Sequence, residues 1–172
     1  MLPLIAVALI IAGLMVLLFG RRKQAEAGLP IGRVVYADAG DWRAVEKPLF
    51  SETYRLTGRP DYLVQHGRQI IPVEVKSTVA PPDGPHRGHV LQLAAYCLLV
   101  EENYQRRPKY GIVKYADRMF EVDFTDNLAA TLLDVIAAMQ DDLLRGGASR
   151  SHTETARCLR CGFRQACDER LA

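Results

Sequence analysis

The chain has 172 residues, of which 49% are hydrophobic and 24% charged, a composition that allows one globular domain with an appended segment. Its formal net charge is +2, which excludes binding to nucleic acid through overall charge alone and leaves local charge as the relevant quantity. Three of its four cysteines lie close together near the C-terminus, a pattern that favours a metal or cluster framework over scattered disulfides.

The first segment in chain order is an uncharged apolar run over residues 2–19. As a helix, such a run is about 27 Å long, close to the roughly 30 Å of a bilayer's hydrocarbon core. A cleaved signal peptide is the alternative, because Ala25-Glu26-Ala27 has the small-x-small form of a cleavage site. Charge placement favours an uncleaved anchor, since Arg21-Arg22-Lys23 follows the run and no Lys or Arg precedes it. The positive-inside rule then predicts a single-pass membrane protein whose C-terminal domain is cytoplasmic.

A weak strand is expected at residues 34–36, and the first strong signal is a β-hairpin. Residues 62–65 and 70–75 are rich in β-branched and aromatic side chains and flank a short turn. Gly67 at the first central position suits a two-residue type II′ turn. Counting outward from that turn places Asp61 opposite Glu74.

Two carboxylates and an ammonium are therefore expected on one face of the hairpin, because opposed residues share a face and Lys76 lies two residues beyond Glu74. Adjacent carboxylates are costly unless a cation lies between them, and Mg²⁺ or Mn²⁺ accepts one or two carboxylates with waters and a substrate phosphate. Asp61, Glu74 and the Val75 carbonyl are the candidate metal ligands, and Lys76 is the candidate for stabilising charge on phosphorus. A surface hairpin with a cross-strand charge pair is the alternative.

Residues 77–89, rich in Pro and Gly, predict a loop whose His86 and His89 could reach a metal or a phosphate, although exposed loop histidines more often have no such role. The apolar spacing over residues 90–104 then predicts a helix. Gln92 and Tyr96 are four residues apart and so project from one side of it. Cys97 is interpreted as a buried small hydrophobic residue.

Two short alternating runs, at residues 110–115 and 119–124, predict a second hairpin. Thr125-Asp126 can cap a helix over residues 127–144, which Gly146-Gly147 ends. The order of hairpin, helix, hairpin and helix fits an α/β fold with a mixed sheet.

The C-terminal tail carries Cys158, Cys161 and Cys167, a spacing that suits a metal or a cluster. Zinc held by these thiolates and His152 is one alternative, and an empty tail is another. The tail is also locally basic and could follow a phosphate backbone through its arginines, which are Arg145, Arg150, Arg157, Arg160, Arg164 and Arg170.

Four motifs occur in a characteristic order. Through these motifs the chain resembles the PD-(D/E)XK nuclease superfamily, in particular its RecB-like branch and the CRISPR-associated Cas-four exonucleases. The motifs are Gly-x-x-Asp at Gly58 and Asp61, Glu-x-Lys at Glu74 and Lys76, Gln-x-x-x-Tyr at Gln92 and Tyr96, and the cysteines of the tail. The resemblance covers about residues 49–167.

The resemblance implies a restriction-endonuclease-like core in which Lys76 and Gln92 position the attacking water and Tyr96 holds the bound strand. It also implies a [4Fe-4S] ligand set made by Cys158, Cys161 and Cys167, with one ligand unidentified. The chain departs from the family at this point, because it has no cysteine before Cys97 and no histidine before His66.

The sequence therefore predicts a membrane-anchored, metal-dependent nuclease acting on DNA, with single-stranded DNA favoured. A nuclease-like binding module that does not cut, and a membrane-tethered iron-sulfur redox element, are the alternatives from other classes. The predicted parts are a transmembrane helix at 1–20, a linker at 21–31, the nuclease-like domain at 32–150 and the Cys-rich tail at 151–172.

Overall fold

The structure is a computed structural model that describes residues 33–34 and 41–171. The chain divides into two compact units, Met1–Leu133 and Asp134–Ala172. The predicted membrane helix and the linker lie outside the described residues. Within the part that the structure describes, no helix is long and apolar enough to cross a membrane.

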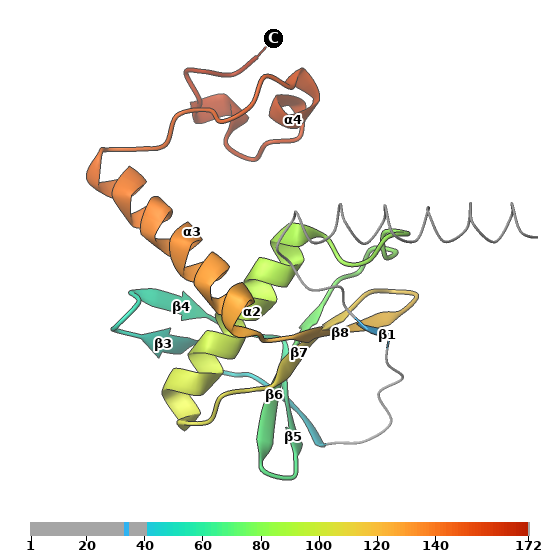
Figure 1. The fold of residues 1–172 in the computed structure, drawn as a ribbon. Helices are drawn as coiled ribbons and strands as arrows, with labels where there is room; N and C mark the ends of the chain where they lie inside the picture. The colour runs from blue at the N-terminus through green and yellow to red at the C-terminus, as the bar shows by residue number, and fades with distance from the viewer. Residues whose placement is uncertain (1–32, 35–40, 172) are drawn as a thin grey trace, which may run out of the picture. The chain divides into compact units, whose positions relative to one another are not determined.

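A six-stranded mixed sheet forms the centre of the first unit, in the order β1-β8-β7-β6-β5-β2 (Figure 1). Every neighbouring pair is antiparallel except β6 and β7, which run parallel. The predicted α/β class and the second hairpin, now β7 and β8, are confirmed. The strands are β1 (Arg33–Val34), β2 (Asp41–Ala44), β5 (Tyr62–His66), β6 (Gln69–Val75), β7 (Tyr110–Lys114) and β8 (Met119–Asp123).

The hairpin of β5 and β6 has the register that the sequence predicted. His66 pairs with Gln69 across the turn, and Tyr62 pairs with Val73 at the far end of the ladder. Gly67 has φ +58°, whereas Arg68 is not among the residues with positive φ, as a type II′ turn requires. The turn therefore sets which residues of the two strands face each other.

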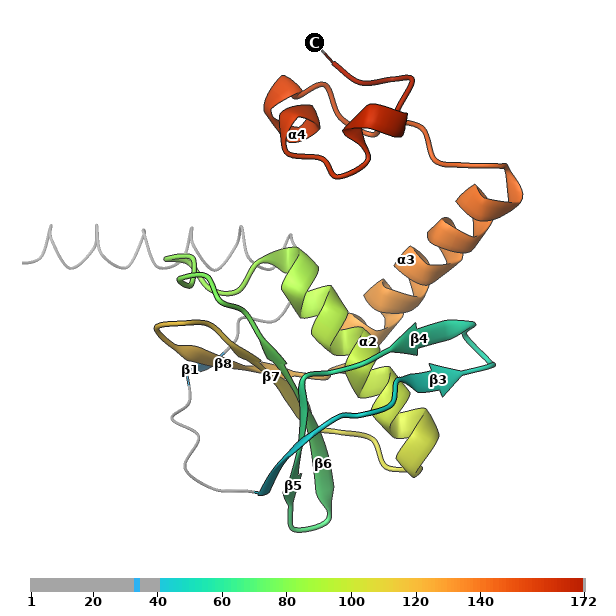
Figure 2. The ribbon, with the colours of Figure 1, turned by 180° about the vertical axis from the view of Figure 1, so that it is seen from behind.

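A second, two-stranded sheet pairs β3 (Leu49–Ser51) with β4 (Leu56–Gly58) and was not predicted. Three residues are too few to show an alternating pattern, so only the tertiary structure reveals these strands. They pack against one side of α2 (Arg87–Tyr104), which lies across the main sheet and also packs on β6 and β7 (Figures 1 and 2).

Helix α2 is buried over more than the single apolar face that its sequence suggested, because it is covered from two sides. It also begins at Arg87, so the predicted loop ends before His89 and His89 lies in the first turn of the helix. The buried residues of α2 are Val90, Leu93, Ala94, Tyr96, Cys97, Leu98, Leu99 and Val100.

Helix α3 (Asp126–Leu144) confirms the last predicted helix, and the Leu128 N–H donates to Thr125 Oγ1 at its start. Its first half ends the first unit, where Leu128 and Leu132 are buried. The second unit contains the rest of α3, the short helix α4 (Thr155–Leu159) and the 3₁₀ turn η1 (Arg164–Ala166).

The close approach of α2 to the sheet depends on Gly111 in β7. A Cβ at this position would lie 2.7 Å from Leu93 Cγ, well inside van der Waals contact. Leu93 is fully buried and adjacent in sequence to Gln92, so the packing at Gly111 sets how far Gln92 lies from the end of β6.

We predict that Gly111→Ala destabilises the first unit by about 1–3 kcal/mol, the usual cost of overpacking a close-packed core. Gly88→Ala is the matched control. Gly88 lies in α2 itself, and a Cβ added there would have nothing within 4 Å. That control should gain up to about 1 kcal/mol from helix propensity. Urea denaturation followed by circular dichroism measures both, and equal stability of the two variants would contradict the packing argument.

Candidate active site

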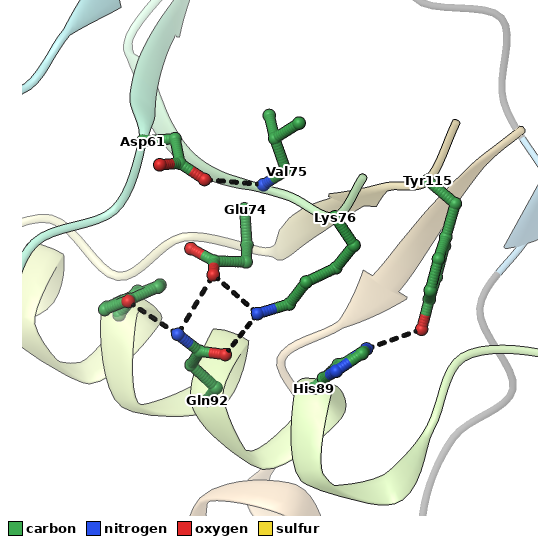
Figure 3. Close-up of polar contacts among 8 residues, drawn as sticks. Asp61, Glu74, Val75, Lys76, His89, Gln92 and Tyr115 are labelled. Carbon is green, nitrogen blue, oxygen red and sulfur yellow. Dashed lines mark hydrogen bonds and ion pairs between the residues drawn. The ribbon is translucent and has the colours of Figure 1, made fainter. Parts of the chain in front are cut away.

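The end of the β5–β6 hairpin and one side of α2 together form a polar site (Figure 3). Asp61 directly precedes β5, Glu74 is the last but one residue of β6, and Lys76 follows that strand. Gln92 and Tyr96 come from α2. The structure therefore brings together the side chains that the sequence assigned to one site, although they come from three separate segments.

A chain of hydrogen bonds joins these side chains. Lys76 Nζ donates to Glu74 Oε1 at 2.8 Å and to Gln92 Oε1 at 2.9 Å. Gln92 Nε2 donates to Glu74 Oε1 at 3.0 Å and to the Tyr96 hydroxyl oxygen at 2.9 Å. An ammonium has only donors and a carboxylate has only acceptors, so the orientation of the Gln92 amide is determined by its neighbours.

Glu74 is only 7% exposed, and a buried carboxylate is costly unless it is paired and hydrogen-bonded. Lys76 and Gln92 both satisfy Glu74 Oε1. A hydrogen bond with the Tyr96 hydroxyl also acts on this carboxylate, while neither Lys76 nor Gln92 contacts Oε2. The network thus holds Oε1 in place from two sides.

Asp61 is held by the backbone of the neighbouring strand, because its Oδ2 accepts the Val75 N–H at 2.7 Å. Lys76 N donates to Lys114 O, so residue 76 faces β7 and Val75 faces the opposite edge, toward Asp61. The N–H and C=O of one strand residue point to the same edge, and the Val75 carbonyl therefore lies on the Asp61 side. Asp61, Glu74 and Val75 therefore lie near one another at the end of the hairpin (Figure 3), and their role as metal ligands stays a prediction.

Tyr96 lies against Gly58, the glycine of the Gly-x-x-Asp motif. A Cβ on Gly58 would lie 2.9 Å from Tyr96 Cε1, so the ring needs a glycine at this position. Burial raises the pKa of the Tyr96 phenol, and the charges of Glu74 and Asp61 raise it further, whereas the hydrogen bond from Gln92 acts in the opposite direction. A hydrogen bond between the Tyr96 hydroxyl and Glu74 also raises this pKa, so Tyr96 is a neutral hydroxyl at physiological pH.

The donors of this site fit Mg²⁺ or Mn²⁺. Asp61 and Glu74 each have one carboxylate oxygen outside the hydrogen bonds with Val75, Lys76 and Gln92, and the Val75 carbonyl adds a third oxygen. Across residues 33–34 and 41–171, no three or more His, Cys, Asp or Glu side chains gather into a group that could hold a metal. A cation here would have two carboxylates and would complete its shell with water or substrate oxygens, as Mg²⁺ does.

The sequence matches the family model of the PD-(D/E)XK nuclease superfamily over residues 6–168. The chain belongs to this superfamily. It is also 28% identical over 120 residues to the CRISPR-associated exonuclease Cas4 of Francisella tularensis subsp. novicida (strain U112), an alignment that covers 70% of this chain and 60% of that protein. This chain thus spans about 60% of the length of that relative. A solved structure, the crystal structure of SSO0001, superposes with a TM-score of 0.46 at 20% identity, covering 80% of this chain and 62% of the other.

The predicted iron-sulfur ligands of this PD-(D/E)XK chain do not form a ligand set in the structure. Cys158 is buried and its Sγ accepts the Leu171 N–H, Cys161 is exposed and Cys167 is partly exposed. His152 Nδ1 accepts the Glu154 N–H, which engages the histidine that a zinc site would need. Among the described residues no three such side chains converge, so the tail does not fit a cluster or a zinc ion as it stands.

Cys97 does not supply the missing ligand, because it is 1% exposed inside α2. Burial raises the pKa of its thiol far above the ordinary value, and a thiolate is the form that binds metal. The interpretation of Cys97 as a buried small hydrophobic residue is confirmed.

His89 is the residue of the site region that the sequence analysis placed wrongly. It is half-buried on α2, where its Nδ1 lies 2.7 Å from the Tyr115 hydroxyl. Burial lowers the pKa of the His89 imidazole, and the charges of Lys76 and His86 lower it further. His89 precedes Gln92 by three residues and Tyr96 by seven, a helical spacing that could have placed it on the same side of the helix. The Pro- and Gly-rich segment before it favoured a loop instead.

We predict that the four thiols differ in reactivity. Iodoacetamide should alkylate the exposed Cys161 readily and leave Cys97 unmodified, because attack requires an accessible thiolate. Mass spectrometry of peptides from the native, metal-depleted protein measures each site, and unfolding in guanidinium chloride should make Cys97 reactive. Labelling of Cys97 in the native protein at the rate of Cys161 would contradict its burial.

Proposed function

We propose that this chain is a metal-dependent nuclease that hydrolyses phosphodiester bonds of DNA, with single-stranded DNA as the favoured substrate. The observation that carries the proposal is the single network that joins Glu74, Lys76, Gln92 and Tyr96 beside Asp61. Its similarity to the exonuclease Cas4 supports cutting from a strand end.

In this mechanism Asp61, Glu74 and the Val75 carbonyl would hold Mg²⁺ or Mn²⁺. When bound, such an ion polarises a phosphoryl oxygen and lowers the pKa of a coordinated water. The hydrogen bond from the Val75 N–H keeps Asp61 oriented before the ion arrives, and the network around Glu74 Oε1 does the same for Glu74. Both carboxylates are thereby preorganised.

Lys76 stabilises the charge that develops on the phosphoryl group. Its Nζ carries three N–H donors, and Glu74 and Gln92 accept two of them. The third has no partner among the described residues and is the donor available to a phosphoryl oxygen or to the attacking water. A fixed donor aimed at developing charge costs no reorganisation during the reaction.

Gln92 and Tyr96 complete the assignment. Gln92 holds the Lys76 ammonium in place by accepting one of its hydrogens, and its own amide hydrogens go to Glu74 and Tyr96. The Tyr96 hydroxyl accepts from Gln92, and its proton, which is hydrogen-bonded to Glu74, can turn to an oxygen of the bound strand. No step of this mechanism requires the C-terminal cysteines.

We predict that Lys76→Ala slows cleavage of labelled single-stranded DNA about 10²- to 10⁴-fold, while DNA binding changes little. An interaction that strengthens only in the transition state is lost from turnover and not from ground-state affinity. Glu74→Ala should lose both metal affinity and cleavage. Lys47→Ala, an exposed lysine, is the matched control and should keep wild-type activity.

The assay is run with Mg²⁺ and with Mn²⁺. Absence of cleavage by the unmodified chain in both metals, together with intact DNA binding, would replace the nuclease with a nuclease-like binding module. Undiminished cleavage by the Lys76→Ala variant would refute the role of that residue.

We also propose that residues 2–19 anchor the protein in a membrane, with the nuclease domain on the cytoplasmic side. Support comes from the uncharged run and the basic residues Arg21, Arg22 and Lys23 that follow it. Protease added to intact cells should spare the C-terminal domain and should degrade it once the membrane is permeabilised. A mature protein that starts near Gly28 in the extracellular fraction would instead establish a secreted enzyme.

A further inference from the structure

Helix α2 presents three polar side chains in one row toward the end of β6. His89, Gln92 and Tyr96 are spaced by three and four residues, so they lie on the same side of the helix. Gln92 and Tyr96 belong to the network around Glu74. His89 lies one turn nearer the helix start, between Lys76 and Tyr115 in Figure 3, and the proposed mechanism leaves it without a role.

Tyr115 determines which ring nitrogen of His89 carries the hydrogen. Its hydroxyl oxygen accepts the backbone N–H of His86 at 3.2 Å and lies 2.7 Å from His89 Nδ1. Tyr115 is only 1% exposed, so its own proton needs a protein acceptor, and Nδ1 is the acceptor in contact. The neutral imidazole therefore carries its hydrogen on Nε2.

The Nε2–H of His89 has no hydrogen-bond partner among the described residues. The ring is half-buried, and the Lys76 side chain is close enough to act on it electrostatically. The first turn of α2 contains no acidic residue. The donors of His89 and Lys76 thus face the same region, and the first turn of α2 offers them no carboxylate. This arrangement favours an anion between the two donors.

The segment that leads from Lys76 to His89 is held on the turn between β7 and β8. The Ala80 N–H donates to Asp117 Oδ1 at 2.7 Å, and the Arg118 guanidinium donates to the carbonyls of Ala80 and Pro81 at 3.2 and 3.3 Å. Ala116 N also donates to Thr78 O. This part of the predicted loop is consequently tied at several points, and His89 is preorganised relative to Lys76.

We propose that His89 is a strand-binding residue that donates its Nε2–H to a phosphate oxygen of the nucleic acid, next to the phosphate whose developing charge Lys76 stabilises. Tyr115 is the positioning residue that keeps His89 in the neutral tautomer with its donor free. The inference rests on the proposed function, because it takes the substrate at Lys76 to be a phosphodiester strand. It adds a contact that the Asp-Glu-Lys and Gln-Tyr motifs do not include.

The experiment measures binding of the full-length chain to a fluorescein-labelled single-stranded oligothymidylate, with Ca²⁺ in place of Mg²⁺ so that binding is followed without turnover. His89→Ala should raise the dissociation constant about 10- to 100-fold, the loss expected for a hydrogen bond to a charged group. His89→Gln should restore most of the affinity, because its amide N–H reaches to the position of Nε2. His66→Ala is the matched control, since His66 is exposed at the far end of the hairpin, and should bind like the unmodified chain.

Salt dependence separates a neutral donor from a cation. A neutral imidazole releases no counterion, so the slope of log affinity against log salt should be the same for His89→Ala as for the unmodified chain. A slope reduced in the His89→Ala variant would show an imidazolium and overturn the tautomer assigned through Tyr115.

Tyr115→Phe tests the positioning role, because it removes the hydroxyl and keeps the ring. Its affinity should fall between those of the unmodified chain and of His89→Ala. Binding by His89→Ala equal to that of the unmodified chain, or by His89→Gln no better than by His89→Ala, would overturn the inference even if the chain cleaves DNA. If cleavage is absent but the His89 effect on binding persists, the catalytic proposal fails and the strand contact stands.

Discussion

The buried carboxylate of Glu74 is the constraint on which the site depends. At 7% exposure it cannot remain charged without partners. Both partners of its Oε1 lie outside β6, because Lys76 follows the strand and Gln92 belongs to α2. Lys76 supplies the charge and Gln92 supplies a second donor while holding the ammonium. The arrangement that lets Glu74 be buried therefore also orients Lys76. Removal of Lys76 would leave the Glu74 charge uncompensated, and removal of Gln92 would take away one of its hydrogen bonds. Stability and chemistry are coupled here, because the same hydrogen bonds serve both.

The position of α2 relative to the sheet makes this coupling possible. Gln92 reaches Glu74 only because the helix backbone comes close to β6 and β7, and two glycines permit that approach. Gly111 makes room for Leu93, and Gly58 makes room for the Tyr96 ring. The glycine of the Gly-x-x-Asp motif thus acts through packing, while the aspartate three residues later is held by the Val75 N–H. The Gly-x-x-Asp motif thus combines space for the Tyr96 ring with a carboxylate held beside Val75.

The geometry of the tail differs from what its cysteine spacing suggested, and the difference has a physical origin. Spacing in sequence shows that thiolates can converge, but convergence needs an ion to offset their mutual repulsion and to fix the intervening turns. In the described residues the three tail cysteines occupy separate environments, and the fourth cysteine is buried in α2 of the other unit. The carboxylates of the candidate active site are different, because hydrogen bonds from the protein itself keep them in place.

The sequence by itself determined the features that depend on local periodicity. The turn at Gly67 set the register that brings Asp61 toward Glu74, and helical spacing put Gln92 and Tyr96 on one side of α2. Only the tertiary structure decided the rest. The three-residue strands β3 and β4 are too short to have a pattern, and the start of α2 at Arg87 lies beyond a Pro- and Gly-rich segment that reads as a loop. His89 is positioned by Tyr115, which is 26 residues away in sequence. A contact over that separation arises from the packing of the helix on the sheet, which no local pattern encodes.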